Sequence, residues 1–180
     1  MAVANNQKSA GPLGPAKGTE LESSAGIDHN AADRFTWAIA AIGAHLEELR
    51  YFWAKKLGIS GPQWMIIMAL ADMDQEDGVP VNAVSKKLRV DSSFVTTQSK
   101  LLEKKGFVRR KPSSEDARVV QMSLTDKTRK HLAGLATQQE ALNAFIFAEF
   151  DSRALEEFTE KLAALQSRLE KACMKVTLDF

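Results

Sequence analysis

The chain has 180 residues, of which 44% are hydrophobic and 26% are charged, and its formal net charge is +1. This length and composition suit one globular domain with extensions and exclude a collagen-like or wholly disordered chain. No apolar run approaches the roughly 20 residues of a membrane helix, so we expect no membrane partner and a cytoplasmic protein. The single cysteine, Cys173, excludes an intramolecular disulfide, as is usual in a reducing compartment.

The N-terminal part of the chain divides into a tail and a helix. Residues 1–29 are rich in Ala, Gly, Asn, Ser and Pro and have no sustained apolar block, which predicts a disordered tail. Residues 30–58 are predicted to form an N-terminal helix of a dimerisation region, with the helix itself running from Ala31 to Lys56. Its apolar residues recur at intervals of three and four: Phe35, Ile39, Ile42, Leu46, Leu49 and Trp53.

Residues 59–125 have the order of parts of a winged helix-turn-helix. Ser60 and Gln63 have the spacing of a capping box at the start of a helix. Pro80 is expected to start the next helix, whose buried side carries Val84 and Leu88. The fold class predicted for the whole chain is therefore mainly α, with a small β-hairpin wing and dimerisation helices at both ends.

The helix expected from Asp91 to Gly106 carries the candidate DNA-reading face. Asp91 can accept hydrogen bonds from the first turn, and Gly106 follows as a stop signal. Val95, Leu101 and Leu102 are expected on its apolar side, with the small Ser99 packed beneath. The opposite side is short, polar and nearly free of negative charge, which allows close approach to bases and phosphates. Its candidate DNA contacts are Ser92, Ser93, Thr96, Thr97 and Lys100.

The following segment alternates as a β-hairpin does. Val120, Met122 and Leu124 share one strand face, and residues 107–111 form the partner strand. From Lys86 to Arg118 there are ten Lys or Arg and four Asp or Glu, a local balance of +6 in a chain of +1. Such a concentration of charge favours phosphate binding. The candidate DNA contacts of the hairpin are Arg109, Arg110, Lys111, Asp116 and Arg118. A solvated helical hairpin and a winged helix that binds protein stay open as alternatives.

These motifs resemble the MarR/SlyA family of bacterial transcription regulators, over roughly Phe35 to Leu169. The likeness is densest at residues 60–65, 90–96 and 102–127, where Asp116 and Arg118 match the family's wing pattern. The resemblance implies that the helix from Asp91 enters the major groove and that Arg118 enters the minor groove. It also implies that Asp116 helps to hold the basic side chains of the wing.

Three positions depart from the family pattern. Arg89 occupies the turn between the two helices, where the family usually has Gly, so it must adopt a costlier backbone conformation or a different turn. Phe94 stands where the family often has a small polar residue, and Ser92 where it often has Arg. Because arginine is the usual reader of guanine, we expect fewer guanine contacts from this helix start.

Residues 126–180 are predicted to form C-terminal dimerisation helices. One helix is expected from Thr125 or Asp126 to about Phe150, and another from Asp151 or Ser152 to about Val176. The second carries an apolar stripe of Leu155, Phe158, Leu162, Leu165 and Leu169. Since apolar stripes at both ends of the chain exceed what one small lobe needs to cover, we expect a homodimer on a palindromic DNA site. A monomer that closes its own core with both stripes is the alternative.

The resemblance also implies a small-molecule effector, typically an aromatic acid or its conjugate, bound between the dimer helices and the DNA-binding lobe. The candidate ligand-binding residues are Trp37, His45, Arg50, Trp53, Trp64 and Met68. Aromatic walls with a few polar groups suit such a pocket, and Arg50 or His45 could pair with a carboxylate. The simpler interpretation is that the tryptophans are core residues and that Arg50 is a surface cation.

The sequence shows no phosphate loop, nucleophile motif or cysteine–histidine metal cluster, so we expect no enzyme, cofactor or metal site. We therefore predict a dimeric repressor that a small ligand releases from its operator. An effector-independent architectural or activating DNA-binding protein is the alternative. A thiol-based redox sensor that uses Cys173 is a third hypothesis.

Overall fold

The computed structural model describes residues 28–73 and 78–179. The chain divides into two units, one ending at Leu46 and the other starting at Glu47. Helix α1 (His29–Lys56) crosses this boundary and confirms the predicted first helix. The tail predicted for residues 1–29 lies outside the described residues except for Asp28 and His29, and His29 is already helical.

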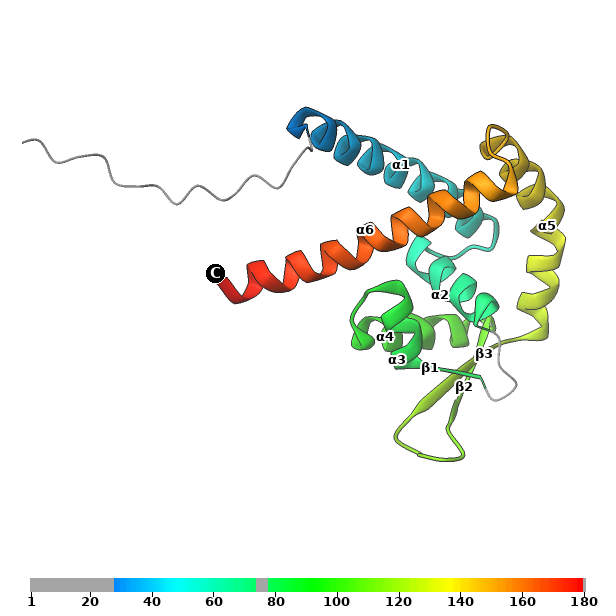
Figure 1. Ribbon diagram of the computed structural model, residues 1–180. Helices are drawn as coiled ribbons and strands as arrows, with labels where there is room; N and C mark the ends of the chain where they lie inside the picture. The colour runs from blue at the N-terminus through cyan, green and yellow to red at the C-terminus, as the bar shows by residue number, and fades with distance from the viewer. Residues whose placement is uncertain (1–27, 74–77, 180) are drawn as a thin grey trace, which may run out of the picture. The chain divides into compact units, whose positions relative to one another are not determined.

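Within the second unit, three helices pack with a small antiparallel sheet (Figure 1). The helices are α2 (Gly61–Asp72), α3 (Val81–Leu88) and α4 (Ser92–Lys104). The strands are β1 (Val79–Pro80), β2 (Val108–Pro112) and β3 (Val120–Leu124), in the order β1-β3-β2. The hairpin of β2 and β3 extends beyond the helices as a wing, so the predicted mainly α fold with a β-hairpin wing is confirmed.

Capping side chains define where these helices start. Ser60 and Gln63 form both bonds of the predicted capping box at α2. Asp91 accepts from the backbone N–H of Ser93 at the start of α4, at 2.9 Å. Pro80 precedes α3 as its N-cap residue, one position before the helix, and makes no side-chain cap bond. The capping residues in the sequence therefore predicted the first residue of α2, α3 and α4 to within one position.

Strand β1 was not predicted from the sequence. It has only two residues, and Val79 pairs with Met122 of β3. Gly78 precedes it with φ of +88°, and a Cβ built there would lie 3.0 Å from the carbonyl oxygen of Met122. Glycine is thus needed for both the backbone angle and the close approach of the two chains.

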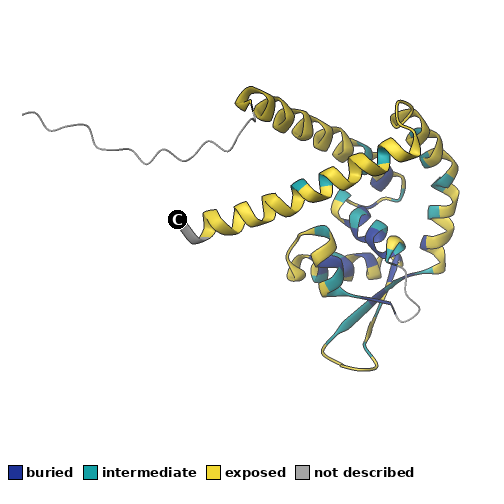
Figure 2. Ribbon diagram, viewed as in Figure 1, coloured by how far each residue is buried: buried dark blue, intermediate teal, exposed yellow. Residues whose placement is uncertain are grey.

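One hydrophobic core joins the end of α1 to the helices and sheet of the lobe. Its largest fully buried apolar side chains are Ile66, Ile67, Leu70, Leu102, Met122, Val79, Val84, Val95 and Val108. Ser99 is also fully buried, as expected, and Figure 2 shows this core in dark blue. The expectation that Leu101 faces the core was wrong, because it is 41% exposed. Val95, Ser99 and Leu102 follow the helical period, and Leu101 lies about 100° away from Leu102.

Two further helices complete the described chain. Helix α5 (Asp126–Ile146) is capped by the Thr125 hydroxyl, which accepts from the N–H of Thr128. It ends four residues before the predicted Phe150. Helix α6 (Ser152–Asp179) continues beyond the predicted Val176, and Figure 2 shows most of it exposed. None of the helices in residues 28–73 and 78–179 is long and apolar enough to cross a membrane.

Candidate nucleic-acid interface

The site begins at the turn between α3 and α4. Arg89 adopts the left-handed conformation there, with φ of 54° and ψ of 46°, which is the first of the two alternatives that the sequence left open. Asp91 then caps α4, and its hydrogen bond from the Ser93 backbone lowers the pKa of its carboxyl below 3.8. The negative carboxylate therefore persists at the positive end of the helix, which fixes the first turn of α4.

The outward face of α4 is polar, as predicted. Ser93, Thr97 and Lys100 are exposed, whereas Thr96 is half-buried. The Thr97 hydroxyl donates to the carbonyl oxygen of Ser93 at 2.9 Å and thus stays close to the helix. Ser92 contributes to the geometry of the lobe, because its hydroxyl lies 2.9 Å from that of Ser85 on α3. A small, cation-bearing face of this kind can approach a nucleic-acid groove closely.

The basic strand β2 presents its cations on two different faces. Arg109 and Lys111 are exposed, and Arg109 lies 3.8 Å from Asp126. The structure places Arg110 differently from its two neighbours: its side chain is only 12% exposed, and its guanidinium lies 3.9 Å from Glu103 of α4. The carboxylate of Glu103 also accepts from the Arg110 backbone N–H at 3.0 Å. Arg110 therefore connects the wing to α4 instead of standing free beside Arg109 and Lys111.

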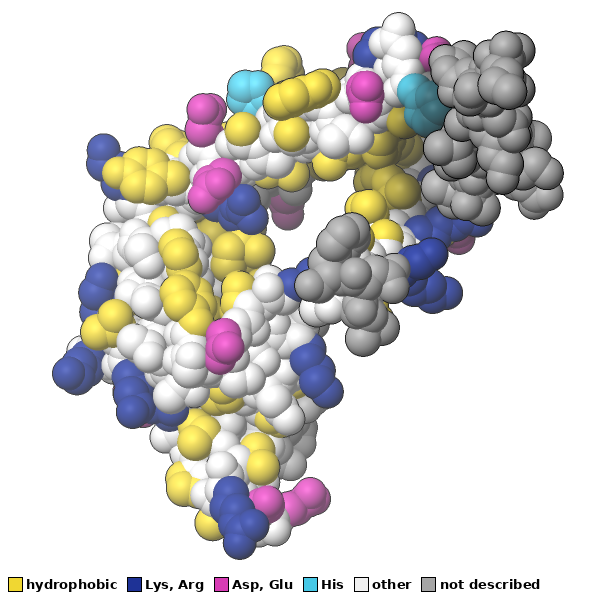
Figure 3. Space-filling model, turned by 90° about the vertical axis from the view of Figure 1, so that its left-hand side faces the viewer, with side chains coloured by type: hydrophobic (Ala, Val, Ile, Leu, Met, Phe, Trp, Pro, Cys, Tyr) yellow, Lys and Arg dark blue, Asp and Glu magenta, His cyan; other side chains and the backbone are white. Residues whose placement is uncertain are grey.

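The tip of the wing is a tight turn ordered by short polar side chains. The Asp116 carboxylate accepts a hydrogen bond from the backbone N–H of Arg118 at 2.9 Å. The backbone N–H of Ser113 donates to the carbonyl oxygen of Val119 at 2.8 Å. Arg118 is exposed. The Asp116 side chain thus contacts the backbone of Arg118 itself, and this hydrogen bond shapes the tip. Figure 3 shows basic and acidic side chains together at the lower end of the molecule, where the wing ends.

A hollow of about 280 Å³ lies between α4 and the wing. It brings together Ser92 and Thr96 of α4 with Arg110 and Arg118 of the wing. Its other lining residues are Val81, Asn82, Val119 and Val120. The start of α4 and the basic wing thus border one concave surface. Asn82 was not predicted, because nothing in its local sequence marks it apart from an ordinary helix residue.

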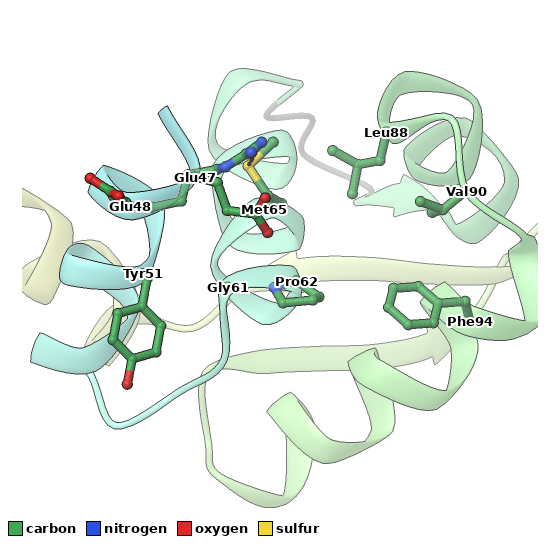
Figure 4. A pocket seen from close by; sticks show the side chains of 10 residues that line it. Glu47, Glu48, Tyr51, Gly61, Pro62, Met65, Leu88, Val90 and Phe94 are labelled. Atoms are coloured by element: carbon green, nitrogen blue, oxygen red, sulfur yellow. Dashed lines mark hydrogen bonds between the residues drawn. The ribbon is translucent and has the colours of Figure 1, made fainter. Parts of the chain in front are cut away.

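A larger cavity of about 640 Å³ lies behind the turn between α3 and α4 (Figure 4). It is lined by Glu47, Glu48, Arg50, Tyr51, Gly61, Pro62, Met65, Leu88, Val90 and Phe94. Figure 4 shows Leu88, Val90 and Phe94 facing Pro62 and Met65 across it. Arg50 is half-buried, and its guanidinium Nη1 lies 3.8 Å from the thioether sulfur of Met65, a weak acceptor. An apolar cavity with a few charged groups suits a small organic molecule.

Of the six predicted ligand-binding residues, only Arg50 lines this cavity. Trp53 and Trp64 are buried in the core, and Met68 packs against it. Trp53 also borders a smaller hollow with Leu49, Phe52, Gln138 and Leu142. Trp37 and His45 belong to the first unit. The sequence did not indicate Tyr51, Pro62 or Phe94, although Phe94 had been noted as an unusual large side chain on α4.

Residues 28–73 and 78–179 contain no group of three or more His, Cys, Asp or Glu side chains that could hold a metal ion. Cys173 is exposed on α6.

Comparison with known proteins identifies the lobe that carries these surfaces. The family model described as the MarR family matches residues 59–120, which run from two residues before α2 to the first residue of β3. Over these residues, about a third of the chain, the sequence matches the MarR family. The matched region contains α4, β2 and the wing tip, which carry all the predicted DNA contacts.

Curated relatives of this chain are named as transcriptional regulators. It is 28% identical over 100 residues to the HTH-type transcriptional regulator SarZ of Staphylococcus haemolyticus, covering 56% of this chain and 63% of the relative. It is 29% identical over 125 residues to the HTH-type transcriptional repressor MdtR of Bacillus subtilis, covering 67% and 78% respectively. The match to SarZ thus spans just under two thirds of the relative's length.

Two solved structures share the fold of this chain at low sequence identity. The Staphylococcus aureus MepR–DNA complex has a TM-score of 0.64 and 17% identity, covering 74% of this chain and 97% of the other. CouR from Rhodococcus jostii RHA1, solved with p-coumaroyl-CoA, has a TM-score of 0.65 and 16% identity, covering 74% and 92%. At these identities the likeness concerns the fold.

Proposed function

We propose that this MarR-family protein is a dimeric, sequence-specific DNA-binding transcription regulator, and in particular a repressor that a small ligand releases from a palindromic operator. The observation that carries the proposal is the common surface of α4 and the wing. Ser92, Thr96 and Arg118 border one hollow, with the exposed Lys100, Arg109 and Lys111 on the same two elements. In this proposal α4 reads the major groove and the wing contacts the minor groove and phosphates.

The dimer in this proposal accounts for apolar side chains that the described chain leaves exposed. On α1 these include Phe35, Ile39, Ile42 and Leu46, and on α6 they include Phe158, Leu169, Met174 and Val176. Burying such side chains between two copies is favourable, and two-fold symmetry would present two α4 helices to two half-sites. The similarity to the repressor MdtR supports the repressor role.

The effector in this proposal is an aromatic carboxylate or its conjugate, bound in the cavity behind the turn. Tyr51, Phe94 and Met65 offer apolar walls for a ring. The Arg50 guanidinium has only the weak sulfur acceptor of Met65 within the described contacts, so it retains donors for a carboxylate. The CouR complex shows that a protein of this fold can hold an aromatic acyl conjugate. Glu47 and Glu48 also line the cavity, so the ligand's charge must be tested directly.

The DNA-binding part is tested by capturing and sequencing genomic fragments on the purified protein at near-physiological salt. We expect a few palindromic sites, and Arg118→Ala should weaken binding to them by about 1–3 kcal/mol. Lys130→Ala, which removes an exposed cation on α5 away from the wing, is the matched control. Diffuse retention that disappears with modest salt would favour the effector-independent architectural alternative.

The ligand part is tested with cinnamate and cinnamylamine, which share a ring and differ in charge. We expect cinnamate to raise the unfolding temperature and weaken operator binding, and Arg50→Gln to remove both effects. The same response to cinnamylamine alone would contradict the carboxylate and point to Glu47 or Glu48. If neither compound changes stability or operator affinity, the aromatic-effector proposal loses its support.

A further inference from the structure

The turn between α3 and α4 is attached to the C-terminal helix through one side chain. The Arg89 guanidinium forms an ion pair with Glu170 of α6 through its Nη2. With the Gln166 amide oriented so that its oxygen faces the guanidinium, that oxygen also accepts from Arg89 Nε at 3.1 Å. Gln166 and Glu170 are one helical turn apart, so both can face the same cation. Arg89 thus joins parts of the chain that are 81 residues apart in sequence.

The backbone at Arg89 makes this contact informative. A left-handed conformation disfavours any side chain, and within residues 28–73 and 78–179 Arg89 is the only non-glycine residue with positive φ. Arg89 makes its bonds to Glu170 and Gln166 from this left-handed backbone. The favourable free energy of these bonds therefore offsets part of the conformational cost. Glycine would accept the same turn without strain, but it could not make this connection.

Two structural consequences follow from the position of Arg89. Asp91, which caps α4, lies two residues further on, so the turn sets where α4 begins. Leu88 and Val90, the neighbours of Arg89 on either side, both line the 640 Å³ cavity. A molecule in that cavity would therefore touch the turn that Arg89 holds to α6.

We infer that Arg89 is a positioning residue that couples α6 to the recognition helix. Its contacts with Glu170 and Gln166 hold the turn, so that a change in α6 or in the cavity alters the orientation of α4. This inference rests on the proposed function for its consequence in DNA binding. The mechanical coupling itself does not depend on DNA and can be tested without it.

The first test is residue-resolved amide hydrogen exchange on the full chain. The Val90 N–H donates to the Ser85 carbonyl oxygen at 3.1 Å, so its exchange rate reports opening of the turn. We expect Glu170→Gln to accelerate exchange at Val90. Asp72→Asn, which breaks the exposed ion pair between Asp72 of α2 and Lys87 of α3, should leave it unchanged.

A double-mutant cycle separates coupling through Arg89 from a general effect of the mutation. Arg89→Gly keeps the turn conformation and removes the side chain, so adding Glu170→Gln to it should produce no further acceleration. The inference is overturned if Glu170→Gln leaves Val90 exchange unchanged. It is also overturned if Glu170→Gln has the same effect with Arg89→Gly as with wild type.

The second test measures operator affinity of the same variants. We expect Glu170→Gln to change the operator Kd by about two- to fivefold, the range that an exposed ion pair can supply, and to have no effect in the Arg89→Gly background. An equal change in both backgrounds would contradict the coupling. Failure of the wild-type protein to bind any specific site would instead count against the proposed function, since the exchange measurement requires no operator.

Discussion

At the scale of single residues, Gly78 shows how a backbone approach limits the sequence. Its φ of +88° and the 3.0 Å distance from a built Cβ to the Met122 carbonyl oxygen both oppose a side chain. We predict that Gly78→Ala lowers the free energy of unfolding by about 1–2 kcal/mol. Urea denaturation at fixed protein concentration measures this change.

Gly134→Ala is the matched control for this prediction. Gly134 lies within α5, and a Cβ there meets nothing within 4 Å. Alanine should therefore stabilise the helix by about 0.5–1 kcal/mol. If Gly78→Ala left the free energy of unfolding unchanged, neither the positive φ nor the approach to Met122 would constrain residue 78.

Asp91 gives a pH dependence with a defined sign. The Ser93 N–H bond lowers its pKa below 3.8 in the folded state, so the unfolded state binds its proton more tightly. The stabilisation from this carboxylate is therefore present above about pH 4 and is lost as the pH falls through the folded pKa.

Asp91→Asn isolates this contribution, because asparagine caps a helix well but does not titrate. We predict that the stability of wild type relative to Asp91→Asn declines when the pH is lowered from about 6 to about 3. Chemical denaturation of both proteins at each pH gives the difference, in which the other carboxylates largely cancel. A difference that does not vary with pH would contradict the assigned cause.

Some residue-level features were predictable and others were not. The missing glycine at Arg89 predicted either a costlier backbone conformation or a different turn, and the structure has the former; the Asp91 cap followed from residue type and position. The burial of Arg110 was accessible from strand alternation, which places residues 108 and 110 on one face and residues 109 and 111 on the other. The burial of Arg110 was missed because Arg109, Arg110 and Lys111 were treated as one basic segment. The ion pair of Arg110 with Glu103 is a tertiary contact, which local sequence does not encode.

At the scale of elements, α4 has to serve a core and an outer surface at once. Leu102 is fully buried, whereas the adjacent Leu101 is 41% exposed. We predict that Leu102→Ala lowers the free energy of unfolding by about 2–5 kcal/mol. Leu101→Ala removes the same atoms from the same helix and should cost about 1 kcal/mol or less. Similar losses in thermal or urea unfolding would mean that Leu101 is buried in the protein as it exists in solution.

The elements found from the sequence were those with strong local signals. Helices α2 and α4 have polar caps, and α4 ends before Gly106, which has φ of +76°. Strand β1 was missed because two residues carry no alternation pattern, and its pairing with β3 is a long-range contact. The end of α5 at Ile146 was also missed, since no Gly or Pro follows within residues 147–151 to mark it.

At the scale of the whole molecule, the exposed apolar face of α6 leads to a prediction about assembly. Leu169 is 55% exposed and belongs to the three-and-four stripe that the sequence predicted. We predict that Leu169→Asp weakens self-association by at least about tenfold, because a charge replaces an apolar contact between copies. Operator binding should weaken with it, since a monomer presents one recognition helix to a two-part site. Sedimentation equilibrium over a range of concentrations measures the first effect and gel-shift titration the second.

Ser167→Asp is the control, because it adds the same charge to the same helix two residues away, on a different face. It should leave self-association within about twofold of wild type.

If both variants remain dimers, α6 does not form the interface by this stripe, and the apolar residues of α1 become the candidates. If wild type itself is monomeric, the proposed palindromic operator would be occupied one copy at a time. Its binding isotherm would then fit two independent half-sites, which the same gel-shift titration can distinguish from binding of a preformed dimer.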